Sequence, residues 1–164
     1  MGGNTATLWQ GRVTQFGLTP SVYRHPMDAT TARVFSDPPM NFLSVTKSDN
    51  KLMFGDGQSA PATGTLGDLA DGTYTAGFRP NHLELEQKSG DALEFMANLI
   101  VTEITGSETF VHLDYHGDRW VGLIHGVRDL TLGSKLPVYL DPSHVYIFGE
   151  DGALVAPASY ALAA

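Results

Sequence analysis

Apolar and polar positions alternate along most of this chain, in short runs that stop at glycine, proline or asparagine. Such runs occupy 5–9, 12–16, 41–45, 51–54, 73–78, 83–86, 109–115, 119–125, 135–140 and 144–148. Side chains of a strand point alternately to its two faces, so each run predicts a half-buried strand. A longer apolar run at 93–104 predicts a bent strand in a barrel wall. Turn signals about every 8 to 12 residues favour a small closed β-barrel.

Two breaks in this pattern predict short helices near the N-terminus. Thr19 is the expected N-cap of the first, with Pro20 at its first position and Pro26 ending it. A second helical segment is expected at 29–35. The fold class predicted is therefore mainly β with one or two short N-terminal helices. The glycine-rich stretch 55–71 is expected to be a mobile connector, and the tail 156–164 to be frayed.

Composition limits the possible partners. The chain has 164 residues, a net charge of −8 and no cysteine. Nucleic-acid binding needs clustered lysine and arginine, so no nucleic-acid partner is expected. Without cysteine, disulfides and thiolate chemistry are excluded, which fits a reducing cytoplasm. No run approaches the roughly 18 apolar residues of a membrane span.

Catalytic motifs are missing from the sequence. It contains no G-x-x-x-x-G-K-[ST] phosphate loop and no G-x-S-x-G elbow. His112, Asp114 and His116 alternate along one expected strand and would share a face, where His125 could join them. Two imidazoles and a carboxylate can bind zinc, and a polar outer face of a strand would look the same. The second interpretation is preferred, so neither a catalytic residue nor a metal site is predicted.

The corner at 77–83 carries two polar side chains, Arg79 and His82, around Pro80. Proline fixes φ near −65° and pushes the preceding residue towards an extended conformation. The sequence thus predicts a strand end, a rigid turn and a new strand.

Several blocks, in order, resemble ATP-binding subunits of ABC importers. They are Gly11–Gly17, Thr19-Pro20 with Tyr23–Pro26, Pro38–Leu43, Gly77–Leu83, Val101–Val111, Pro137–Asp141 and His144–Phe148. The corner is similar to the family's G-I-R-P-E-H-L, with Asn81 where glutamate is frequent. The resemblance covers nearly the whole chain and points to the C-terminal region of a maltose or glycerol-phosphate importer-like subunit.

The resemblance implies an oligonucleotide/oligosaccharide-binding (OB)-like barrel, the TOBE module, over 37–164. Residues 1–36 would be the junction with the nucleotide-binding domain. The implied function is non-catalytic regulation and dimerisation in an importer for sugars or related solutes. No cofactor is expected in this fragment, since ATP and Mg²⁺ would bind the missing domain. The expected partners are a second copy, the membrane subunits and a regulatory protein.

The same resemblance implies a cytoplasmic location, with the parent protein peripheral on the inner membrane. Candidate ligand or interface residues within the blocks are Asn41, Arg79, His82, Glu103 and Glu108. Two other functions stay open. One is a barrel that binds small anions or sugars through Arg79 and His82, and the other is an enzyme using metal on the His112 face. The N-terminal hairpin is expected to be mobile, exchanged with a partner, or folded back on the barrel.

Overall fold

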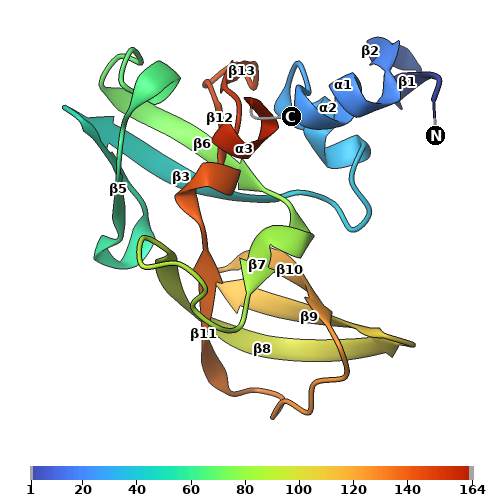
Figure 1. The fold of residues 1–164 in the computed structure, drawn as a ribbon, viewed down its shortest axis with the longest axis vertical. Coiled ribbons are helices and arrows are strands. Elements are labelled where there is room, and N and C mark those ends of the chain that lie inside the picture. Colours follow the sequence, from blue (N-terminus) through green and yellow to red (C-terminus); the bar gives the residue numbers. More distant parts are fainter. Residues whose placement is uncertain (1, 163–164) are drawn as a thin grey trace.

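The computed structural model describes residues 2–162, and strands dominate it (Figure 1). The expected mainly β fold is confirmed. The strands are β1 (Asn4–Trp9), β2 (Arg12–Leu18), β3 (Asn41–Ser48), β4 (Lys51–Met53), β5 (Ser59–Pro61), β6 (Gly72–Phe78), β7 (Leu83–Glu84), β8 (Leu93–Thr105), β9 (Glu108–Tyr115), β10 (Asp118–His125), β11 (Lys135–Leu140), β12 (Tyr146–Phe148) and β13 (Leu154–Ala156). The α-helices are α1 (Thr19–Arg24), α2 (Ala29–Val34) and α3 (Ser159–Leu162). Short 3₁₀ turns are η1 (Gly55–Gly57), η2 (Gly64–Leu66), η3 (Pro80–His82) and η4 (Pro142–His144).

The strands form three sheets. A two-stranded hairpin (β1-β2) lies at one end of the molecule with α1 and α2, beside a six-stranded sheet, and a five-stranded sheet lies at the other end (Figure 1). The five-stranded order is β10-β9-β8-β11-β7, and its outer strands β7 and β10 also lie against each other. This sheet is therefore a nearly closed barrel of the OB type. The six-stranded order is β13-β12-β6-β3-β4-β5.

The barrel interior follows the alternation in the sequence. On β9 and β10 the apolar residues of one face are all buried, and Trp120 is the largest of them; the others are Val111, Leu113, Tyr115 and Ile124. The Trp120 ring stacks on Tyr115 at 4.4 Å between centroids, and its indole N–H donates to the Phe42 carbonyl at 3.0 Å. Position 122 of β10 favours glycine, because a Cβ there would come within 2.7 Å of the Val111 side chain. The core is thus continuous between barrel and six-stranded sheet.

A second apolar cluster joins the helices to the six-stranded sheet. It contains Ala32, Met40, Tyr146, Phe148 and Ala158. α3 belongs to this cluster, so the expectation of a frayed tail was wrong for residues 156–162. Three alanines of this tail, Ala156, Ala158 and Ala161, are buried, and Tyr160 of α3 packs against the cluster. Residues 163 and 164 lie outside the described part of the chain.

Two further local expectations differ from the structure. Thr19 is the first residue of α1 and not its N-cap; its hydroxyl bonds Thr5 Oγ1 at 2.7 Å. The connector 55–71 contains β5, which pairs with β4, and the Asn50 carbonyl accepts a hydrogen bond from Ala62 N–H. The expectation of a mobile connector was based on the glycine-rich composition, which does not indicate these backbone hydrogen bonds.

The hairpin β1-β2 has its apolar face outward. Cross-strand pairs place Ala6 with Phe16, Leu8 with Val13, and Asn4 with Leu18 on one side. The side chains Ala6, Leu8, Val13, Phe16 and Leu18, called here the hairpin face, are all exposed, the four large ones by 57–67%. The opposite side carries the buried Thr7, whose hydroxyl bonds Thr14, and α1 and α2 lie against this hairpin.

Candidate functional site: the junction pocket

Arg79 is buried at the point where α1 and α2 meet the barrel corner. It is 1% exposed, and its guanidinium donates to the carbonyls of Tyr23 and Phe35, the latter at 3.4 Å. The Tyr23 carbonyl lies in the last turn of α1, and Phe35 caps the C-terminus of α2. Carbonyls at helix C-termini lack intrahelical partners and carry partial negative charge. The cation therefore satisfies two helix ends at once.

An aromatic contact completes this arrangement. The guanidinium carbon of Arg79 lies 3.5 Å from the centroid of the Tyr23 ring, and Phe35 meets that ring edge-on. Burial raises the pKa of the Tyr23 hydroxyl, partly offset by the positive charge of Arg79. Arg79 therefore acts as a clamp between helices and barrel, and its charge does not face solvent.

His82, the second polar residue of the corner, stacks on His144. The two rings lie 4.0 Å apart and nearly parallel, with Tyr160 of α3 edge-on to both. Burial, with His144 and Arg79 nearby, lowers the pKa of His82 to about 4, and burial also lowers the pKa of His144. Both imidazoles are thus neutral near pH 7, and they hold α3 against the corner.

Asn41 closes the edge of β10. Its amide nitrogen donates to the Val121 carbonyl and its amide oxygen accepts from the Val121 N–H, both at 2.8 Å. The side chain thus replaces a neighbouring strand for one residue of β10. Being 3% exposed, it connects the two large sheets from within.

The remaining sequence candidates lie on the outer side of β8 to β10. Glu103 contacts His112 at 2.9 Å, and Glu108 lies 3.9 Å from His125. His116 occupies a left-handed turn position and pairs instead with Asp56 at 2.9 Å. Among residues 2–162, no three histidine or acidic side chains are grouped closely enough to hold a metal ion. The alternation of His112, Asp114 and His116 on one face does not extend to His116, because β9 ends at Tyr115.

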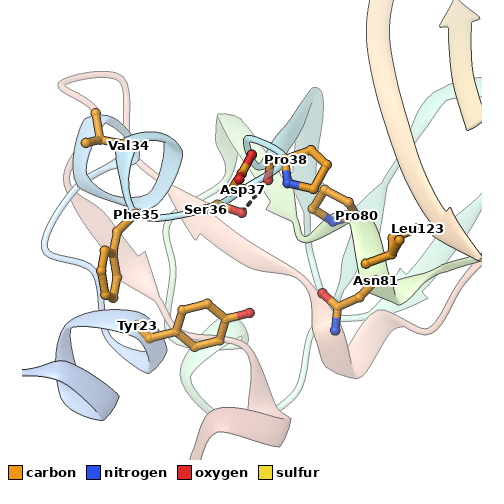
Figure 2. A pocket seen from close by; sticks show the side chains of 9 residues that line it. All are labelled: Tyr23, Val34, Phe35, Ser36, Asp37, Pro38, Pro80, Asn81 and Leu123. Atoms are coloured by element: carbon orange, nitrogen blue, oxygen red, sulfur yellow. Dashed lines mark hydrogen bonds between the residues drawn. The ribbon is translucent and has the colours of Figure 1, made fainter. Parts of the chain in front are cut away.

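A pocket of about 510 Å³ lies beside the Arg79 clamp, and Figure 2 shows it from close by. We call it the junction pocket. Its lining residues are Tyr23, Val34, Phe35, Ser36, Asp37, Pro38, Pro80, Asn81 and Leu123. They come from the helices, the connector to β3, the corner and β10. The hydroxyl of Tyr23 and the amide of Asn81 point toward one another from opposite sides of the hollow (Figure 2).

Sequence reasoning brought Arg79 to attention but missed Tyr23, Phe35 and Asp37. An available signal was the aromatic residue placed just before each expected helix end, three residues before Pro26 and Pro38. Helix ends need partners for their carbonyls, and a nearby buried arginine supplies them.

Comparison with known proteins gives relatives over most of the chain. The sn-glycerol-3-phosphate import ATP-binding protein UgpC of Vibrio vulnificus is 32% identical over 147 residues, which are 87% of this chain and 38% of the relative. The xylose/arabinose import ATP-binding protein XacK of Haloferax volcanii is 26% identical over 159 residues, 93% of this chain and 41% of the relative. The chain thus spans about two fifths of the length of these relatives. No family model matches it.

These matches show that the chain is related to the ATP-binding subunits of solute importers, as the block order in the sequence predicted. This chain also aligns with a solved structure of the cytoplasmic molybdate-binding protein ModG with molybdate bound. The aligned part is 65% of this chain and 94% of the ModG chain. Its TM-score is 0.47 and its identity 17%. None of the helices within residues 2–162 is both long and apolar enough to cross a membrane.

Proposed function

We propose that this chain is the non-catalytic regulatory and dimerisation region of an importer ATP-binding subunit for sugars or related solutes. Relatives along 87% and 93% of the chain support this, because they are named for import of glycerol phosphate or of xylose and arabinose. In this proposal ATP and Mg²⁺ bind the remaining part of such a subunit, and the region described here hydrolyses nothing.

The hairpin face is the observation that carries the proposal. Four large apolar side chains, each more than half exposed, gather on one side of a two-stranded sheet. A contiguous exposed apolar patch of this kind marks an interaction site. We assign it to the ATP-binding part of the subunit, so that the hairpin connects that part to α1, α2 and the barrel.

The other partners follow from this assignment. A second copy would contact the barrel, and the importer's membrane subunits would contact the complete subunit at the cytoplasmic face of the membrane. A regulatory protein is a further candidate for the barrel surface. The Arg79 clamp supports a regulatory role, because it couples the position of α1 and α2 to the barrel corner.

Sedimentation velocity across protein concentration tests the proposal. The chain and its Leu8→Ser/Phe16→Ser variant should both form dimers, since the barrel carries the contact, while larger aggregates should decrease in the variant. The matched control is Val127→Ser/Leu132→Ser, which removes two equally exposed apolar side chains elsewhere. A strictly monomeric, folded hairpin variant would assign all self-association to the hairpin face and contradict dimerisation through the barrel.

A further inference from the structure

The junction pocket has walls from two parts of the chain that are distant in sequence. Tyr23 and Phe35 belong to the helical part, and Pro80, Asn81 and Leu123 belong to the barrel corner and β10. Its volume of about 510 Å³ lies within the roughly 300–1,000 Å³ typical of small-molecule sites. Such sites form preferentially where two structural units meet.

The chemistry of the walls is mostly apolar with a few polar groups. Aromatic, proline and aliphatic side chains make most of the surface, and Asp37, Asn81 and the Tyr23 hydroxyl supply the polarity. The Ser36 hydroxyl is already used, because it donates to the Pro38 carbonyl at 2.7 Å. The amide and the phenol face each other across the hollow, as Figure 2 shows, where each can donate and accept.

Charge distinguishes between possible ligands. No lysine or arginine is among the residues that line the junction pocket. Arg79, which precedes Pro80, has both Nη atoms bound to helix-end carbonyls and is 1% exposed. Asp37 contributes a carboxylate to the lining. An anion such as a phosphate ester would meet that negative charge with no cation in the lining to balance it. A neutral molecule with hydroxyl groups and an apolar face meets no such penalty.

We propose that the junction pocket binds a neutral sugar or polyol, with Asn81 and the Tyr23 hydroxyl bonding its hydroxyls and Phe35 packing on its C–H face. The proposal rests on the regulatory role proposed above, for which it names the ligand class.

Binding at this place has a mechanical consequence. The ligand touches Tyr23 and Phe35, whose carbonyls Arg79 holds, and also Pro80 and Asn81, which follow Arg79 in the chain. It therefore favours the arrangement in which α1 and α2 are seated on the corner. A ligand that binds one arrangement better shifts the population toward it. Ligand binding thus changes the position of α1 and α2, and of the hairpin against which they lie, as the solute concentration changes. The ATP-binding part of the subunit, which we assigned to the hairpin face, would respond to that change.

Titration calorimetry of the 164-residue chain tests this with D-xylose, L-arabinose and glycerol, and with inorganic phosphate as the anionic probe. We expect saturable binding of at least one neutral probe and none of phosphate. Loss of one hydrogen bond should weaken binding by about tenfold in both Asn81→Ala and Tyr23→Phe. Asn50→Ala, in a different surface hollow, should bind like the native chain.

The proposal is overturned if no neutral probe gives heat at concentrations up to about 50 mM. A Kd above that concentration corresponds to a binding free energy of less than about 2 kcal/mol. Equal affinity of the native chain and Asn81→Ala overturns it as well, as does preferential binding of phosphate. Circular dichroism confirms that each variant is folded. Sedimentation of the same samples separates the two proposals: dimers without sugar binding refute the ligand alone, whereas monomers refute the dimerisation role.

Discussion

Replacing Arg79 with methionine probes the clamp that joins helices and barrel. The substitution removes two charge-assisted hydrogen bonds, each contributing about 1.5–3 kcal/mol, and a cation–π contact with Tyr23 of about 2 kcal/mol. It also recovers the several kcal/mol required to desolvate a buried cation. We expect a net decrease of about 2–3 kcal/mol in the free energy of unfolding.

Urea unfolding with native-state hydrogen exchange measures this effect and locates it. Amides of α1 and α2 should lose protection in Arg79→Met, while those of β8 and β9 keep theirs until global unfolding. Arg79→Lys should recover only part of the loss, because an ammonium lacks the planar fork that reaches two carbonyls and stacks on a ring. Arg119→Met, at an exposed position of β10, is the matched control and should change stability by less than about 0.5 kcal/mol.

Two outcomes would refute the reasoning. Native stability in Arg79→Met would mean that the clamp contributes nothing beyond its own desolvation cost. Full recovery in Arg79→Lys would show that positive charge alone matters and that the bidentate geometry does not.

Other side chains give three further predictions. Asn41→Leu leaves the Val121 N–H and carbonyl unpaired and should cost about 2–4 kcal/mol in urea unfolding; a cost near zero would mean water replaces the amide. Gly122→Ala should lower the melting temperature with a loss of about 1–3 kcal/mol, because its Cβ would overlap Val111 unless that side chain moves. Acidification should destabilise the chain through His82: its pKa falls from 6.5 when unfolded to about 4 when folded, so the unfolded state binds more protons between these values. Stability should decrease by about 2 kcal/mol from pH 7.5 to pH 5, and His82→Phe should reduce this pH dependence; equal slopes would assign it elsewhere.

The sequence predicted the strands well, because one buried face forces a period of two. It predicted both helices near the N-terminus and nearly every strand of the barrel and the six-stranded sheet. It did not predict β5, β13 or α3, since these are held by contacts with other elements and not by a strong local pattern. In β5 the backbone pairs with β4 despite Pro61, and in α3 Tyr160 packs against the second apolar cluster while Ala161 is buried.

The candidate site was less predictable for a related reason. Arg79 was selected as a polar side chain at the proline corner, but its burial and its partners were not predicted, because backbone carbonyls carry no sequence signature. Asn41 was selected as a ligand or interface candidate from the block resemblance. In the structure its side-chain amide bonds the backbone of Val121 at the edge of β10. His116 was expected beside His112 on a face, and a left-handed turn residue breaks that alternation.

The hairpin face also determines how self-association of this chain in solution should depend on temperature and salt. Hydrophobic association weakens on cooling, so clustering through Leu8, Val13, Phe16 and Leu18 should be least in the cold. The net charge of −8 opposes such clustering by mutual repulsion, and added salt screens that repulsion. Clarity of a concentrated sample should therefore be best in cold, low-salt buffer and should deteriorate on warming in high salt.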